Sequence, residues 1–215
     1  MTTSRAETGA ERRSGAFRAL HRAAWELVSP WCDIEERLEL IPATARLRGI
    51  LFRSVVEQVE IHGALPRYRE LFPDDRFSSI PFYPLAEYLL RVAVGGALVA
   101  SPERLHDGMH EISRGNAKAF AGSLLGRVMI RLLARDPVRL TEQGVAARRQ
   151  MSSYGRWSIV RHDERSIEVV YEEEYAWIES AIAGSAVGTF EARGIAASIE
   201  TRLKDRFNGS TFIRW

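Results

Sequence analysis

The feature that most constrains the fold of this chain is a change in the spacing of its apolar residues near Tyr154. Before that point, apolar side chains recur at the three-to-four-residue period of a helix with one buried face. After it, most segments alternate apolar and polar residues, which is the period of a half-buried strand. A chain that separates helices from strands in this way is expected to form an α+β fold.

Two β-hairpins are predicted in the last third of the chain. Four segments alternate, over residues 156–161, 166–173, 195–203 and 210–215. Asn208-Gly209 supplies the turn of the second hairpin, since both residues tolerate a left-handed backbone. An apolar helical stripe from Tyr175 to Arg193 separates the hairpins. We therefore expect N-terminal helices packed on a small antiparallel sheet, formed by two C-terminal hairpins with a helix between them.

The part of the chain before Tyr154 is predicted to be mainly helical. Its predicted helices cover residues 17–28, 47–62, 85–99, 102–115 and 116–134, and a helical turn is expected at 67–71. Gly63 is placed to supply the left-handed residue that ends the second of these helices. Residues 34–40 fit either a short helix or an extended segment. Residues 1–16 are polar, so they are expected to form a flexible arm ahead of a single domain at 17–215.

Composition narrows the possible classes of protein. The 30 Lys and Arg residues nearly balance the 28 Asp and Glu residues, and the net charge of +2 creates no strong field toward nucleic acid. The sequence has no apolar run long enough to span a membrane and no apolar segment of a signal peptide, which makes cytoplasmic residence the expectation. Cys32 is the only cysteine, so no internal disulfide forms, and we expect it to be a small buried apolar residue.

Several short motifs carry a resemblance to a known family. They are Ile41–Gly49, Tyr83–Tyr88, Leu125–Arg127 and the ending Phe212–Trp215. In these motifs the chain resembles an uncharacterised myxobacterial paralogous family, domain-of-unknown-function family 2378, over residues 34–215. The order of elements resembles the fold shared by 4-vinyl-reductase-like domains, haem-nitric-oxide-binding domains and small subunits of transport-particle tethering complexes. The resemblance implies a non-enzymatic sensor or scaffold domain in bacterial signalling.

The haem-binding relatives imply ligands that this sequence does not repeat. Those relatives carry a proximal histidine on a helix shortly before the sheet, and a Tyr-x-Ser-x-Arg motif that holds the haem propionates. Residues 137–150 contain no histidine, and the segment after Tyr154 places Arg156 before Ser158, the reverse of the motif's order. The last hairpin also lacks the cysteines found in 4-vinyl-reductase-like domains. No cofactor is therefore expected.

A ligand pocket is predicted beside the core helix at residues 116–134. Gly122 and Gly126 lie four residues apart on that helix and are expected to let a neighbouring element approach closely. The candidate wall residues are Phe120, Leu124, Val128, Trp177 and Phe190. The fold of the relatives implies a small hydrophobic ligand there. The five side chains also suit a plain packed core, and the sequence leaves both interpretations open.

His106 and His110 are the best candidates for a metal site, in an alternative in which the chain is a metal- or haem-binding protein. They lie four residues apart on a predicted helix, so both imidazoles share one face. Three carboxylates lie nearby in the sequence, those of Glu103, Asp107 and Glu111. The His-Glu-x-x-His signature of zinc enzymes is incomplete, and Gly108 weakens the helix. The other interpretation is a solvated helix face.

A second alternative is a DNA-binding regulator. Arg148 and Arg149 end a segment that resembles the first helix of a helix-turn-helix, but no recognition helix follows, so nucleic acid is not the expected partner. The acidic run Glu172–Glu174 is interpreted as a solvated strand end or as a helix start, where carboxylates suit the helix dipole. The sequence contains no nucleophile elbow and no phosphate-binding loop. The expected partners are a second copy of the chain, bound through its helices, another protein, or a hydrophobic small molecule.

Overall fold

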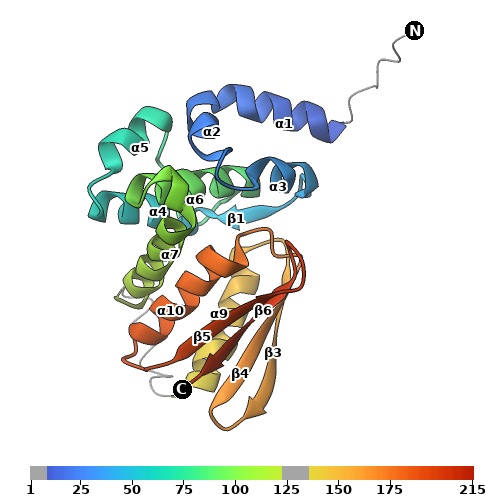
Figure 1. Cartoon of the computed structure of the whole chain (residues 1–215), viewed down its shortest axis with the longest axis vertical. Coiled ribbons are helices and arrows are strands. Elements are labelled where there is room, and N and C mark those ends of the chain that lie inside the picture. Colours follow the sequence, from blue (N-terminus) through green and yellow to red (C-terminus); the bar gives the residue numbers. More distant parts are fainter. Residues whose placement is uncertain (1–8, 123–135) are drawn as a thin grey trace.

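The computed structural model describes residues 9–122 and 136–215, which form a helical half and a half built on a sheet (Figure 1). The helical half contains α1 (Gly9–Leu20), α2 (Arg22–Val28), α3 (Ile34–Leu40), α4 (Gly49–Ile61), α5 (Leu65–Leu71), α6 (Leu85–Val99) and α7 (Leu105–Gly122). The sheet half contains α9 (Pro137–Met151), β3 (Arg156–Asp163), β4 (Ser166–Glu172), α10 (Ala183–Glu191), β5 (Ser198–Leu203) and β6 (Gly209–Arg214). The expected α+β architecture is confirmed.

Two helices, α1 and α2, stand where one helix is expected at residues 17–28, and α1 begins at Gly9, inside the expected arm. The chain breaks at His21, whose backbone leaves the helical region (φ −113°, ψ 34°). His21 Nε2 lies 2.9 Å from Glu87 Oε1 on α6, and its ring contacts Phe72. This contact with α6 accounts for a turn that the apolar period alone does not reveal.

Helix α3 forms where the sequence allows a helix or an extended segment, and it joins the two halves. The buried Arg37 donates from Nε to Asp33 Oδ1 (2.8 Å) and from Nη1 to the Tyr175 carbonyl (3.0 Å). Trp177 Nε1 donates to the same Asp33 oxygen (2.8 Å), and Arg206 pairs with Asp33 Oδ2 (2.8 Å). Partial burial raises the pKa of Asp33, but the partner groups, Arg37 first, outweigh burial and hold that pKa below its usual value.

A two-stranded ribbon comes before α4 and α6, where the sequence predicts helix and loop. Strand β1 (Arg46–Arg48) pairs antiparallel with β2 (Phe82–Pro84). Each strand has three residues, which is too short to show a clear alternation. Leu47 at the centre of β1 is buried in the core. Gly63 has a φ of +74° and follows α4, as predicted.

Helices α6 and α7 cross at a pair of glycines. A Cβ on Gly108 would lie 2.0 Å from the Gly96 carbonyl oxygen, so only glycine permits this approach. Gly115, where the sequence predicts a helix end, lies inside α7 instead. A Cβ on Gly115 would lie 1.8 Å from Gln58 Oε1, so this glycine makes room for a buried side chain and does not end the helix.

Among the described residues, no single helix is both long and apolar enough to cross a membrane. The segments Leu85–Val99 and Pro102–Ala117 reach that length and apolarity only together, and they are bent by 115°.

The sheet has the strand order β3-β4-β6-β5, with every neighbouring pair antiparallel, so both predicted hairpins are confirmed. Ile159, Val169 and Thr211 lie in register across the face that packs on α9 and α10. The opposite face is open, and Val160 on it is 44% exposed. The last turn differs from the prediction, because Gly209 is already part of β6.

The helix expected between the hairpins begins as a π-helical turn (Ile178–Ile182) and continues as α10. Helix α10 lies beside α7 (Figure 1), and the two backbones touch. A Cβ on Gly184 would lie 2.2 Å from the His110 carbonyl oxygen, and one on Gly188 would lie 2.1 Å from that of Arg114. The two halves are therefore joined by direct backbone contact at these two glycines, and by the ion pair of Arg114 on α7 with Glu191 on α10 (2.8 Å).

Candidate functional site

An apolar groove runs between α10, strand β5 and the C-terminal residues. It has a volume of about 550 Å³ and is lined by Val187, Phe190, Glu191, Ile195, Ala196, Ala197, Ser198, Ile199, Arg214 and Trp215. Most of these side chains are apolar, while Glu191 and Arg214 add one charge of each sign. A groove of this composition suits an apolar molecule with a polar end. We refer to it as the α10 groove.

The α10 groove contains one of the five predicted wall residues, Phe190, which is buried. Trp177 lies elsewhere, fully buried in the helical core with the Arg37 guanidinium 4.8 Å from its ring centre. Leu124, Val128 and the side chain of Phe120 lie outside the described residues, as does Gly126. A pocket formed by all five residues therefore stays a prediction.

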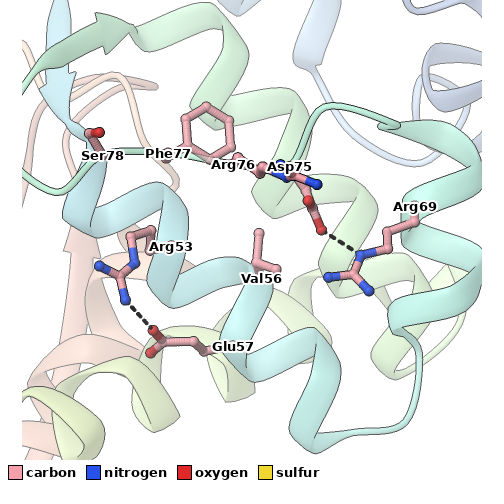
Figure 2. A pocket seen from close by; sticks show the side chains of 8 residues that line it. All are labelled: Arg53, Val56, Glu57, Arg69, Asp75, Arg76, Phe77 and Ser78. Carbon is pink, nitrogen blue, oxygen red and sulfur yellow. Dashed lines mark hydrogen bonds and ion pairs between the residues drawn. The ribbon is translucent and has the colours of Figure 1, made fainter.

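A second groove, of about 360 Å³, is polar and lies between α4, α5 and the loop before β2. Its lining residues are Arg53, Val56, Glu57, Arg69, Asp75, Arg76, Phe77 and Ser78. Figure 2 shows Arg53 with Glu57 at one end and Arg69 with Asp75 at the other, with Val56 between them. The sequence does not reveal this groove, because α4, α5 and the following loop are consecutive in the chain and only their folding back on one another brings these side chains together.

His106 and His110 both lie on α7, near the start of α10. His106 Nδ1 is 3.3 Å from Ser180 Oγ and 4.0 Å from Glu179 Oε1, and its ring meets that of Trp177 edge-on. Within residues 9–122 and 136–215, no group of three or more His, Cys, Asp or Glu side chains is arranged to hold a metal ion. Metal binding by this pair therefore stays a prediction and requires a ligand from elsewhere.

A buried charge centre closes the space between α9 and the start of the sheet. Glu174 is fully buried, and its carboxylate pairs with Arg148 (2.8 Å). Glu174 also accepts hydrogen bonds from Trp157 Nε1 (2.8 Å), the Tyr154 hydroxyl (3.2 Å) and the Ala176 N–H (3.0 Å). Burial raises the pKa of Tyr154 well above its usual value, so this phenol stays neutral.

This centre corrects two interpretations made from the sequence. Glu174 belongs to the acidic run interpreted as solvated, yet four donors surround its carboxylate. Arg148, one of the two arginines considered for phosphate contact, is held in this centre, and only Arg149 is exposed. The burial of Glu174 could have been inferred from the apolar segment that directly follows it, because that segment is buried and Glu174 is the adjacent residue.

Cys32 is partly exposed and packs against the helical core, so the expected apolar role fits. Burial raises the pKa of its thiol to about 12, so the thiolate is scarce at neutral pH.

The histidines of the chain lie away from α9. His21 is between α1 and α2, His62 follows α4, His106 and His110 are on α7, and His162 is on β3. Helix α9 therefore has no histidine that could bind a haem iron, and its Arg148 is already paired with Glu174.

The comparison with solved structures defines the class of the fold. The H-NOX protein of K. algicida matches with a TM-score of 0.57 and 17% identity, over 78% of this chain and 96% of that chain. An H-NOX protein from S. oneidensis, in the Fe(II)NO state, matches with a TM-score of 0.58 and 14% identity, over 78% and 98%. A mutant of T. Tengcongensis H-NOX matches with a TM-score of 0.53 and 15% identity, over 78% and 97%. The chain has the H-NOX fold.

The family is identified by its own sequence model. Residues 41–215 match the family described as "Protein of unknown function (DUF2378)", and the chain belongs to it. No curated protein matches the sequence. Helices α1, α2 and α3 come before the matched region.

Proposed function

We propose that this chain is a non-enzymatic sensor or scaffold domain that binds a small apolar molecule in the α10 groove. The observation that carries the proposal is the groove itself, a volume of about 550 Å³ lined mainly by apolar side chains and closed at its base by Phe190. The shared fold with H-NOX proteins supports a sensor role.

The packing of α10 explains how binding can be transmitted. Val187 and Phe190 line the groove, while Gly184 and Gly188 on the same helix touch the backbone of α7. A ligand that displaces α10 must also displace α7, because close-packed backbones leave no slack. The helical half is then the part that reports the signal to a second copy or another protein. Dimerisation stays a prediction, to be checked by analytical ultracentrifugation.

The groove is tested with the fluorescent probe 1-anilinonaphthalene-8-sulfonate and a filling variant. Ala196 lines the groove and is exposed, so Ala196→Trp fills the space without disturbing the core. We expect probe affinity to fall at least about tenfold. Val160→Trp, on the open face of the sheet, is the matched control and should leave affinity unchanged. Equal affinity in both variants, or no probe binding to the wild type, contradicts the proposal.

Native mass spectrometry tests the same proposal without a chosen ligand. Protein purified from its own host should carry an added mass of a small molecule, and the Ala196→Trp variant should lose it. A wild-type spectrum that contains only the apo mass, as monomer or dimer, counts against a resident ligand.

Haem is the second candidate, because one of the neighbouring structures is described as "Probing the function of heme distortion in the H-NOX family". The described residues do not fit a haem held from α9. That helix has no histidine, and Glu174 already neutralises its buried Arg148. Of the five histidines, all of which lie outside α9, His106 and His110 share one helix, α7, and are the candidates for an alternative site.

A visible absorption spectrum with metal analysis decides this candidate. Haem or metal binding predicts a coloured or metal-loaded sample that loses its signal in His106→Ala and His110→Ala, with His62→Ala as the control. A folded, colourless and metal-free sample, which also fails to take up added haemin, rejects it.

A further inference from the structure

The end of the loop before β2 and the first residue of β2 hold two apolar side chains out in solvent. Ile80 is 76% exposed and Phe82 is 43% exposed, and together we call them the apolar tip. The loop is nonetheless fixed to α4. The Gly49 N–H donates to the Pro81 carbonyl (2.8 Å), and the next N–H of α4 donates to the Ser79 carbonyl (3.1 Å). Because this backbone is already ordered, a partner that covers the tip has little conformational entropy to overcome.

Arg48 places a positive charge against the apolar tip. Its guanidinium lies 4.6 Å from the centre of the Phe82 ring, and Nη1 donates to the Ile80 carbonyl (2.7 Å). Its Nε donates to the Gln150 carbonyl (2.9 Å), which brings the end of α9, with the exposed Arg149, next to the loop. These carbonyls orient Arg48 without neutralising it. No carboxylate of the described residues pairs with Arg48 or Arg149.

The polar groove of Figure 2 lies next to the apolar tip in the chain, because its lining reaches Ser78, two residues before Ile80. Its two carboxylates are already engaged, Glu57 with Arg53 (3.5 Å) and Asp75 with Arg69 (2.7 Å). Arg76 lines the same groove and pairs with no described carboxylate. Arg76 therefore offers an unpaired guanidinium at the groove, with the exposed carboxylate of Asp74 two residues away in the same loop.

We propose that the apolar tip and its surrounding arginines bind the surface of a membrane that contains anionic lipids. The two apolar side chains enter the boundary between headgroups and acyl chains, while the arginines contact lipid phosphates. Ile80 has no ring to stack on a base, and the Arg48 guanidinium already lies over the Phe82 ring, which disfavours nucleic acid. A stable protein interface needs roughly 20–30 residues a side around an apolar centre, and two isolated apolar side chains next to arginine do not match that.

The membrane surface and the α10 groove share no residue, so each proposal can fail without the other. Flotation of the full chain with vesicles tests this one. We expect the wild type to float with vesicles of phosphatidylcholine and phosphatidylserine, and not with phosphatidylcholine alone. The double variant Ile80→Ser/Phe82→Ser should bind at least about tenfold more weakly. Ile61→Ser, at a side chain 70% exposed on α4, is the matched control and should bind as the wild type does.

The arginines are tested in the same assay. Arg76→Gln and Arg149→Gln should each weaken binding about fivefold, because each arginine near an anionic membrane surface contributes that factor to the affinity. Arg165→Gln, in the hairpin between β3 and β4, is the control and should have no effect. Circular dichroism confirms that each variant is folded. The proposal is overturned if the wild type does not float, if binding ignores phosphatidylserine, or if the tip variant floats like the wild type. Binding to duplex DNA in place of vesicles overturns it as well.

Discussion

The two halves of the molecule differ in how they neutralise arginines that are buried or nearly buried. Arg148 in the sheet half meets the fully buried carboxylate of Glu174 at 2.8 Å. Arg91 in the helical half lies 3.4 Å from the partly exposed Glu87, and its guanidinium is 4.2 Å from the centre of the Phe72 ring. The sheet half therefore depends on one complete ion pair, whereas the helical half divides the charge between a carboxylate and an aromatic ring.

The difference predicts where each half is vulnerable. A buried ion pair that loses one partner leaves a bare charge in the interior, which costs far more than the pair contributes. The helical half is instead sensitive where backbones touch, as at Gly96 and Gly108. Charge should govern the stability of the sheet half, and packing that of the helical half.

The largest expected effect is that of Glu174→Gln. The variant leaves Arg148 buried without a counter-charge, so the free energy of unfolding should fall by about 3–5 kcal/mol, measured by urea denaturation. Glu87→Gln is the matched change in the helical half and should cost only about 1 kcal/mol, since Glu87 is partly exposed and Arg91 keeps its aromatic contact. Equal losses in the two variants would remove the distinction between the halves.

Gly108→Ala should have the next largest effect. The new Cβ would lie 2.0 Å from a backbone oxygen of α6, so the helices must separate, at a cost of about 1–3 kcal/mol in thermal or urea unfolding. A variant as stable as the wild type would show that the helical half does not depend on this close approach.

Asp33 joins the halves, and its effect should depend on pH. Its pKa is lower in the folded protein than the usual 3.8, so the ionised form is favoured by folding. The stabilisation is fully present above the unfolded pKa and is lost as pH falls through the folded pKa, below about pH 4. Asp33→Asn should cost about 1 kcal/mol at neutral pH and progressively less in acid. The urea midpoints of the wild type and of Asp33→Asn are compared at neutral pH and at a pH below about 4. An equal difference at the two pH values would contradict this.

The smallest expected effect is a gain. Gly144 lies inside α9 with open space where a Cβ would stand, so Gly144→Ala should raise the unfolding free energy by about 0.5–1 kcal/mol, as seen by differential scanning calorimetry. It is also the control for Gly108→Ala, since both variants add one methyl group to a helix. A loss of stability at Gly144 would mean that an unseen neighbour covers this face.

The sequence predicts those parts of the fold that follow from local period. Helix α4 with Gly63 and the two hairpins are examples, because apolar spacing and turn residues both lie within a few residues of each other. The short ribbon of β1 and β2 escapes prediction because its two strands pair across residues 49–81. Gly115 is misjudged for the same reason, since its role is set by Gln58 on another helix.

The candidate sites are predicted less well than the fold. Phe190 is recognised as a possible wall residue, but the groove around it comes from α10, β5 and the C-terminal residues together. Glu174 is misjudged because charged residues are normally solvated, and only the meeting of Arg148, Trp157 and Tyr154 reverses that preference. Three-dimensional proximity carries this information, and a single sequence does not contain it.

The contacts of α3 also set an order of events during synthesis. Asp33 and Arg37 emerge early from the ribosome, but their partners Tyr175, Trp177 and Arg206 are made near the end. The buried guanidinium of Arg37 has no distant carbonyl to meet until almost the whole chain exists. Contacts between residues so far apart in sequence slow folding. We therefore expect α3 to be fixed last, after α2 has packed against α6, so that in a nascent chain stalled before Trp177 the α3 segment is more sensitive to protease than it is in the finished protein.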